Sequence, residues 1–228
     1  MSSDLAIRGR LRCAALAISG VLLGMTIGWS SAIAKTTEIL VFGDSIAAGF
    51  GLPAGEAFPA RLEAKLRADG LDVHIVNAGN SGDTTADGLA RLDWSLADKP
   101  DFVILELGAN DALRGAGPQQ TRAALDAIIR RLKERRIGVL LAGMLAPRNL
   151  GEDYVKAFDP IYPELAAAYR LILYPFIAEG IVGDRALNQP DGIHPTVAGV
   201  DVIVSRMLPK VEELIAQVRA AQNLKSGQ

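Results

Sequence analysis

Three residues suited to nucleophilic catalysis stand far apart in this chain. Ser45 follows Gly43 and Asp44 at the end of a short apolar run, and Asp191 and His194 lie close to the carboxyl end. A serine hydroxyl becomes a nucleophile only when a positioned base removes its proton. Asp191 and His194 are three residues apart, which on a helical turn places both on one face. The carboxylate would then hold Nδ1 of the imidazole and leave Nε2 facing Ser45.

Two of these residues also have a plain structural interpretation, which for His194 is a capping role on a solvated loop. Ser45 alone is compatible with the cap of a turn that follows a strand. Of the two histidines in the chain, His74 lies inside a predicted strand, so we interpret it as structural. His194 is flanked by Asp191 and stiffened by Pro195, which favours a functional role for its ring.

The elements that must position these residues alternate between strand and helix. The sequence predicts strands at 39–42, 73–77, 101–107, 137–142 and 171–174, and helices at 58–68, 84–96, 119–135, 162–169 and 196–221. Residues 144–160 are predicted to be irregular. Alternation at this spacing is typical of a parallel sheet covered on both faces, so we expect one three-layer α/β/α domain over residues 35–228.

Three of the predicted strands end in loops of small and polar residues: Gly43–Ser45, Asn80–Asp83 and Gly108–Asp111. In a parallel sheet these loops emerge at the same edge, where such sheets bind their ligands. The sequence therefore predicts one site there, assembled from distant segments.

The amino-terminal residues 1–34 have the pattern of a signal peptide. Arg8, Arg10 and Arg12 precede an apolar run from Cys13 to Gly28, and Ala32-Ile-Ala34 supplies a cleavage pattern. The apolar run is shorter than the roughly 20 residues that a membrane span needs. We expect cleavage before Lys35, export to the periplasm or medium, and no stable membrane insertion afterwards.

Composition excludes several classes of protein. The 228 residues are 50% hydrophobic and 22% charged, which is typical of a globular domain. The net charge of −2 and the lack of a basic stripe argue against a nucleic-acid partner. The single cysteine, Cys13, leaves with the predicted signal peptide, so the remaining chain offers no disulfide and no thiolate.

Four separated blocks of this sequence resemble the SGNH, or GDSL, hydrolase superfamily. They are Gly43–Ser45, Ser81–Thr84, Gly108–Asp111 and Asp191–His194. Further similarity around Glu106–Asp111, Leu113–Gly115 and Ile161–Pro163 indicates the bacterial periplasmic branch, which contains arylesterases, acyl-CoA thioesterases and lysophospholipases. The resemblance implies the SGNH hydrolase fold, with five parallel strands in flavodoxin-like order.

The resemblance also implies a role for each matching residue. Ser45 would be the nucleophile, His194 the base that later acts as acid, and Asp191 the residue that orients it. The backbone N–H groups of Ser45 and Gly82 and the side-chain amide of Asn110 would stabilise the oxyanion. No cofactor and no metal are implied, and the partner would be a small ester or lipid-like substrate.

Rival functions are less well supported by the residues. A metal-dependent phosphoesterase could use Asp44, Asn110, Asp111, Asp191 and His194, but such sites usually recruit several histidines. A non-catalytic binding module is disfavoured by the intact serine, aspartate and histidine, and a nucleotide-binding protein by the lack of a glycine-rich phosphate motif after a strand.

Among hydrolases, a carbohydrate O-acetyl esterase is the alternative to an acyl or aryl esterase. Apolar residues in loops that could reach the catalytic edge bear on this choice, although core packing is an alternative explanation for them. If they line the cleft, the substrate carries an acyl chain or aryl group. This predicted wall consists of Leu113, Met144, Leu145, Leu150, Tyr154, Phe158 and Ile193.

Overall fold

A single parallel sheet organises the chain in the computed structural model, which describes residues 35–226. The predicted signal peptide, residues 1–34, lies outside the described residues. The strand order is β2-β1-β3-β4-β5, which confirms the predicted α/β fold and its flavodoxin-like order. The strands are β1 (Thr37–Gly43), β2 (Val73–Gly79), β3 (Phe102–Glu106), β4 (Gly138–Ala142) and β5 (Ile172–Tyr174).

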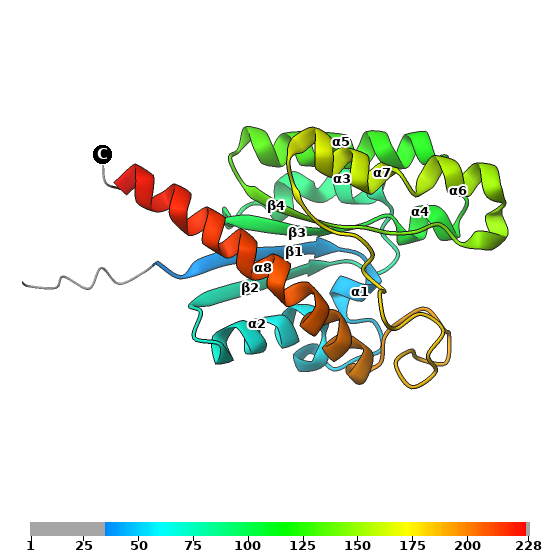
Figure 1. Ribbon diagram of the computed structural model, residues 1–228, viewed down its shortest axis with the longest axis horizontal. Coiled ribbons are helices and arrows are strands. Elements are labelled where there is room, and N and C mark those ends of the chain that lie inside the picture. Colours follow the sequence, from blue (N-terminus) through cyan, green and yellow to red (C-terminus); the bar gives the residue numbers. More distant parts are fainter. Residues whose placement is uncertain (1–34, 227–228) are drawn as a thin grey trace, which may run out of the picture. The chain divides into compact units, whose positions relative to one another are not determined.

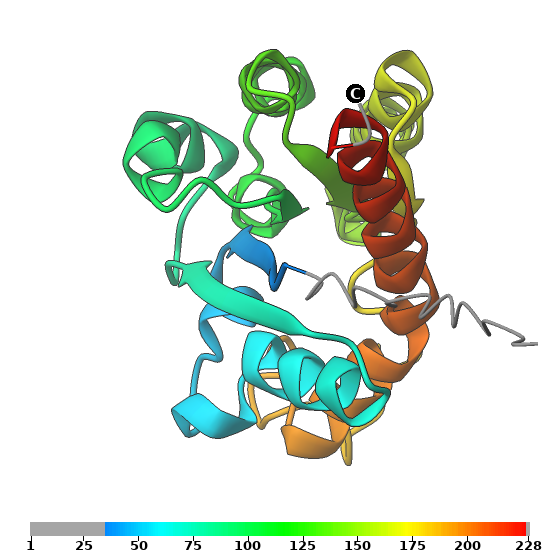
Figure 2. The ribbon, with the colours of Figure 1, turned by 90° about the vertical axis from the view of Figure 1, so that its left-hand side faces the viewer.

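Helices cover both faces of this sheet, as Figures 1 and 2 show. Helices α3, α5 and α7 pack on one face, and α2 and α8 pack on the other. Strands covered on both sides have no solvated face, which is why they are continuous apolar runs rather than alternating ones. These helices are α2 (Phe58–Ala68), α3 (Thr85–Ser95), α5 (Pro118–Glu134), α7 (Ile161–Tyr169) and α8 (Val197–Ser226).

The central strands are the best-buried part of the molecule. All five residues of β3 are buried, and Ile39, Val41 and Phe42 of β1 have no exposed surface. The long helices contribute apolar residues at three- and four-residue spacing, such as Leu125, Ile128 and Ile129 of α5. This core holds the strand ends, and therefore the loops that follow them, in fixed positions.

Several short helices were not predicted from the sequence. Helices α1 (Ser45–Ala48) and α4 (Ala109–Leu113) begin directly after β1 and β3, in segments expected to be loops. Residues 144–160 were predicted to be irregular, and this was wrong: they contain the 3₁₀ helix η2 (Arg148–Leu150) and helix α6 (Glu152–Phe158). These helices span one or two turns, too few for apolar periodicity to reveal them. A further 3₁₀ helix, η1 (Ala54–Glu56), precedes α2.

The short helices gather at the carboxyl end of the sheet. In Figure 1, α1, α4 and α6 lie at the same end of the strands, on the right of the view. Across residues 35–226, no helix is long and apolar enough to span a membrane.

Candidate active site

Ser45 follows the end of β1 and lies in a crowded position at the carboxyl end of the sheet. Gly43 pairs with Gly79 of β2 on one side and with Glu106 of β3 on the other. A Cβ at Gly43 would lie 2.4 Å from Glu106 Oε2, and one at Gly79 would lie 2.2 Å from the backbone nitrogen of Ala48. Only glycine fits at these two positions, and their closeness lets the first turn of α1 rest directly on the ends of two strands.

Ser45, His194 and Asp191 form a continuous chain of hydrogen bonds. Ser45 Oγ lies 2.8 Å from His194 Nε2, and His194 Nδ1 lies 2.6 Å from Asp191 Oδ2. The two ends of this chain are 149 residues apart in sequence. The arrangement has the geometry in which an imidazole can take the serine proton while a carboxylate fixes its tautomer.

Asp191 and His194 lie in a turn rather than on the helical turn expected from their spacing. Asp191 Oδ1 accepts hydrogen bonds from the backbone N–H groups of Ile193 (2.9 Å) and His194 (3.0 Å), and Gly192 has a φ of +72°. The carboxylate therefore closes the turn with one oxygen and holds the imidazole with the other. The hydrogen bond to His194, followed by the two backbone bonds, lowers the pKa of Asp191 to about 2.

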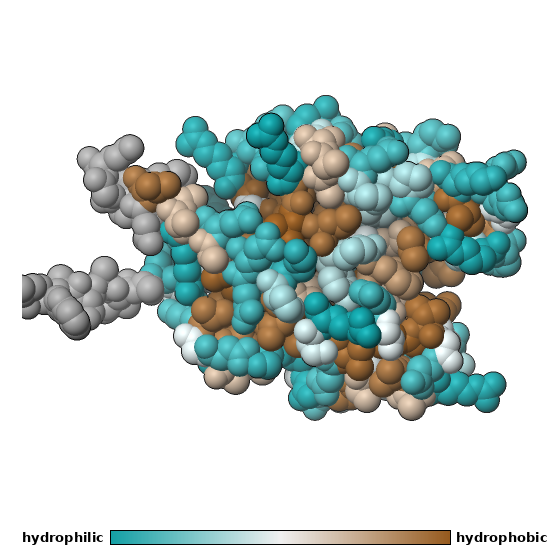
Figure 3. Space-filling view, in the orientation of Figure 1, coloured by the Kyte–Doolittle hydropathy of each residue, from teal (hydrophilic) through white to brown (hydrophobic). Residues whose placement is uncertain are grey.

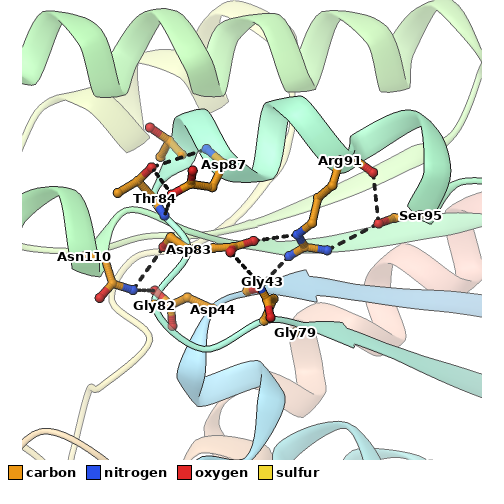
Figure 4. Close-up of polar contacts among 12 residues, drawn as sticks. Gly43, Asp44, Gly79, Gly82, Asp83, Thr84, Asp87, Arg91, Ser95 and Asn110 are labelled. Atoms are coloured by element: carbon orange, nitrogen blue, oxygen red, sulfur yellow. Dashed lines mark hydrogen bonds and ion pairs between the residues drawn. The ribbon is translucent and has the colours of Figure 1, made fainter.

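The structure brings the three predicted oxyanion donors to neighbouring positions. Asn110 Nδ2 donates to the carbonyl of Asp83 (3.0 Å) and to Asp44 Oδ2 (3.3 Å), so it lies between the residue after Gly82 and the residue before Ser45 (Figure 4). Gly82 has a φ of +91°, in the left-handed region that favours glycine. The space around its Cα is open, because a Cβ there would have no neighbour closer than 3.7 Å.

Two buried carboxyl groups lie beneath the serine. Asp44 has no exposed surface and caps α1 by accepting from the backbone N–H of Ile46. Glu106 Oε2 accepts from the backbone N–H of Asp44 at 3.2 Å, and Glu106 Oε1 has no hydrogen-bond partner. Burial raises the pKa of Asp44 to about 6 and raises that of Glu106 well above its usual value.

Asp111 faces away from these groups. Its carboxylate accepts from the backbone N–H and hydroxyl of Thr85 and from the hydroxyl of Thr121. It therefore anchors α4 to α3 and α5 and is occupied by these bonds. Within the described part of the chain, no three histidine, cysteine, aspartate or glutamate side chains are grouped as a metal site would require. His74 is on β2 beside Glu63, with half of its side chain exposed.

The residues of the predicted wall divide by burial. Leu113 is 50% exposed and Ile193 46% exposed, whereas Leu145, Leu150 and Tyr154 are half-buried. The Tyr154 hydroxyl donates to the carbonyl of Ala116, so its polar end is held by the fold.

The remaining two wall residues belong to the core. Phe158 has no exposed surface and packs against Tyr154 and Tyr162, and Met144 is also buried. Phe158 offers no surface to a substrate and Met144, at 9% exposed, offers very little, so neither can form a substrate-contacting wall. Their residue type gave no indication of the direction in which they point.

Two residues next to the hydrogen-bonded chain were not singled out from the sequence. Phe50 is 49% exposed, and its ring centroid lies 4.4 Å from that of His194. Gln189 Nε2 donates to the carbonyls of Phe50 (2.8 Å) and Pro195 (2.9 Å), and so links the loop after α1 to the loop that carries His194. The signal in the sequence was an aromatic residue between two glycines, just after Ser45.

Exposed apolar residues thus come from the segments that carry Ser45, Asn110 and His194. Phe50 follows α1, Leu113 ends α4 and Ile193 precedes His194. In Figure 3, apolar side chains reach the surface among polar ones at the end of the sheet where these segments lie. A hollow of about 930 Å³ lies instead at the amino ends of β3 and β4, among Leu96, Ile137 and Leu214.

Comparison with known proteins gives a matching family model and several similar proteins. Residues 41–202 match the model of the GDSL-like lipase/acylhydrolase family, a range that includes Ser45, Asn110, Asp191 and His194. The esterase TesA of Pseudomonas aeruginosa is 39% identical over 202 residues, which cover 88% of this chain and 99% of that protein. The Escherichia coli protein named thioesterase 1/protease 1/lysophospholipase L1 is 38% identical over 183 residues, covering 80% of this chain and 86% of its own length.

A solved structure shows the same fold. The crystal structure of AlinE4, described as an esterase of the SGNH-hydrolase family, is 46% identical and superposes with a TM-score of 0.68. The match covers 80% of this chain and 98% of that one.

Proposed function

Because the chain belongs to the GDSL-like lipase/acylhydrolase family and is an ester hydrolase, we propose that it cleaves carboxylic esters through an acyl-enzyme on Ser45. The observation that carries this proposal is the hydrogen-bonded chain from Ser45 Oγ through His194 to Asp191, with distances of 2.8 and 2.6 Å. A serine with this support needs no further activation.

In the first half of the reaction, His194 Nε2 takes the proton of Ser45 as Oγ attacks the ester carbonyl carbon. The resulting oxyanion is stabilised by the backbone N–H groups of Ser45 and Gly82 and by the amide of Asn110. The 3.3 Å bond from Asn110 to Asp44 is the longer of its two, and the developing oxyanion takes its place. When the intermediate collapses, the bond to the leaving oxygen breaks and His194 returns the proton to it.

The second half repeats these steps with water. His194 removes a proton from a water molecule, whose oxygen attacks the acyl carbon, and the second intermediate releases the acid and the free Ser45 hydroxyl. Asp191 remains ionised throughout, since its pKa is about 2. It holds the imidazole in one tautomer and stabilises the charge on the ring.

The substrates we propose are small esters or lipid-like molecules with an apolar acyl or aryl group. Phe50, Leu113 and Ile193 support this, because each is about half exposed and belongs to a segment that carries a catalytic group. Leu145 and Leu150 extend the proposed wall. Oxygen esters, acyl thioesters and lysophospholipids share such a group, whereas a sugar acetate does not.

We also propose that the protein is exported after removal of residues 1–34. The charged, apolar and Ala-x-Ala order of that segment supports this. Mass spectrometry of the protein secreted by a bacterial host gives the test: the expected mature chain begins at Lys35, and one that still carries Arg8 to Arg12 would contradict the proposal.

Turnover of p-nitrophenyl esters by two variants tests the catalytic assignment. Ser45→Ala and His194→Ala are each expected to lower kcat by about 10⁴-fold or more, because Ser45 and His194 act as one unit and removal of either abolishes the contribution of both. The double variant should be little worse than either. His74→Ala is the control, since that ring lies on β2 beside Glu63. A His74→Ala variant more damaged than His194→Ala would overturn the assignment.

A panel of esters with acetyl to decanoyl groups tests the substrate class. We expect kcat/KM to rise with chain length as the acyl group covers more apolar surface. Highest activity on acetate esters, together with cleavage of an acetylated sugar, would favour the carbohydrate O-acetyl esterase instead.

A further inference from the structure

A single guanidinium group touches two of the three segments that carry the proposed oxyanion donors. Arg91 lies in the middle of α3, with about a fifth of its side chain exposed. Its side chain leaves the helix toward the carboxyl edge of the sheet, as Figure 4 shows. None of the catalytic steps described above uses it.

The contacts of Arg91 are specific in direction. Its Nη2 donates to the carbonyl of Gly43 at 3.0 Å, and its Nε donates to Asp83 Oδ2 at 2.5 Å. Gly43 is two residues before Ser45, and Asp83 directly follows Gly82. The guanidinium therefore joins the segment that presents the Ser45 N–H to the segment that presents the Gly82 N–H.

Asp83 also links the Arg91 guanidinium to the third proposed donor, the side-chain amide of Asn110. The carbonyl of Asp83 accepts from Asn110 Nδ2 at 3.0 Å, while its carboxylate accepts from Arg91 and from the amide of Asn80. Asp83 is buried, with 6% of its surface exposed. Displacement of its side chain would thus shift both Gly82 and the acceptor that orients Asn110.

The orientation of the guanidinium is itself fixed. Its Nη1 donates to Ser95 Oγ at 3.3 Å, and its central carbon lies 4.2 Å from the centroid of the Phe42 ring. Arginine suits this position because its planar group presents several N–H donors in fixed directions. Lysine would bring the same charge on a point-like group, and could not hold Gly43 and Asp83 in this fork geometry.

From these contacts we propose that Arg91 is a positioning residue for the oxyanion-stabilising donors. It holds the segments of Ser45, Gly82 and Asn110 at fixed separations, so that the donors are in place before charge develops. This inference rests on the proposed acyl-enzyme mechanism. Preorganised donors act on the transition state more than on the bound ester, so their displacement lowers kcat rather than raising KM.

The test compares Arg91→Lys with Arg135→Lys. Arg91→Lys keeps a cation beside the Asp83 carboxylate and removes the planar guanidinium that contacts Gly43 and Asp83 together. Arg135 is the matched control, because it makes an exposed ion pair with Asp93 of α3 and touches none of the donor segments. Thermal unfolding of each variant establishes that it is folded at the assay temperature.

Two readouts separate positioning from general stability. For p-nitrophenyl butyrate, Arg91→Lys should lower kcat by about 10- to 100-fold, less than the 10²–10³-fold of a deleted donor, with KM changed by less than about threefold. Affinity for an alkyl boronic acid, which forms a tetrahedral adduct with the serine, should fall in parallel with kcat. Arg135→Lys should match the parent in both.

Three results would overturn the inference: unchanged kcat in folded Arg91→Lys, a rise in KM alone, or a fall in kcat with boronate affinity intact. If Arg91→Lys does not fold, Asp83→Asn gives the same test, since it breaks the shared carboxylate and leaves the bond to Gly43. Unchanged kcat there would equally refute the inference. Failure of the mechanism itself is distinguishable, because Ser45→Ala would then retain activity.

Discussion

Substitution of Asp191 by asparagine isolates the electrostatic role of this side chain from its structural role. Asp191 Oδ1 accepts two backbone hydrogen bonds that close the turn, whereas Oδ2 contacts Nδ1 of His194 at 2.6 Å. Asparagine keeps one carbonyl oxygen for the two backbone groups, so the turn is retained. Its NH₂ group then faces the imidazole.

The consequence is the wrong tautomer of His194. A donor opposite Nδ1 makes that nitrogen the acceptor, and the proton of the neutral ring moves to Nε2. Nε2 lies 2.8 Å from Ser45 Oγ and can then no longer accept the serine proton. In a buried triad this exchange costs about 10⁴-fold in kcat.

The exposure of Asp191 sets the range for this protein. Its side chain is 38% exposed, so water can partly replace the lost acceptor. We therefore expect a loss in kcat of about 10²- to 10⁴-fold, or about 2.7 to 5.4 kcal/mol. This loss in kcat relative to the parent should be the same from acidic to alkaline pH. The reason is that the Asp191 carboxyl of the parent, with its pKa of about 2, stays ionised over that range.

The assay is the steady-state hydrolysis of p-nitrophenyl butyrate, with thermal unfolding measured in parallel. Asp184→Asn is the matched control: Asp184 Oδ1 accepts from the backbone N–H of Ala186 at 2.8 Å in a nearby turn, without an imidazole. It should retain parental kcat. A kcat within about fivefold of the parent in folded Asp191→Asn would contradict this electrostatic role of Asp191.

Three further substitutions test other parts of the account. Gly82→Ala places a Cβ in open space at a φ of +91°, so left-handed strain of about 1–2 kcal/mol should shift the loop and lower kcat, and an unchanged kcat would remove Gly82 from the oxyanion site. Leu113→Ala removes a half-exposed side chain from the proposed wall and should lower kcat/KM for hexanoyl relative to acetyl esters by about 1–3 kcal/mol, whereas a flat ratio would mean that Leu113 does not contact the acyl group. Burial raises the pKa of Asp44 from 3.8 to about 6, so its stabilising contribution is complete below 3.8 and is lost as the pH rises through about 6. In urea unfolding, the free energy of the parent should therefore fall relative to that of Asp44→Asn across this range, and a difference independent of pH would contradict the assigned pKa.

Much of the fold was predictable because the sheet is covered on both faces. Such strands are continuous apolar runs, and the long helices between them carry apolar residues at regular spacing. Helices α1 and α4 were missed because each spans about one turn and begins at glycine-rich loops, where composition favours irregular structure.

The site was predictable where residue type alone determines the chemistry. Ser45, Asp191 and His194 were identified from the sequence, and the structure brings them into hydrogen-bond contact. The surroundings were not, because their role depends on tertiary approach. Arg91 has the pattern of an ordinary charged residue on a helix, and only the fold directs it to Gly43 and Asp83.

Apolar type also does not show which way a side chain points. Phe158 and Leu113 were predicted together as wall residues, yet Phe158 is fully buried and Leu113 is half exposed. Phe50 was overlooked because its loop is short and rich in glycine, and its contact with His194 joins segments more than 140 residues apart.

The most direct test of the central claim is to trap the acyl group on its residue. The parent is mixed with p-nitrophenyl butyrate, quenched in acid during turnover, digested and analysed by mass spectrometry. We expect a butyryl group on the peptide that contains Ser45, increased in Asp191→Asn if deacylation slows more than acylation, and absent from Ser45→Ala. A butyryl group on another residue, or ester hydrolysis by Ser45→Ala at the parental rate, would contradict it.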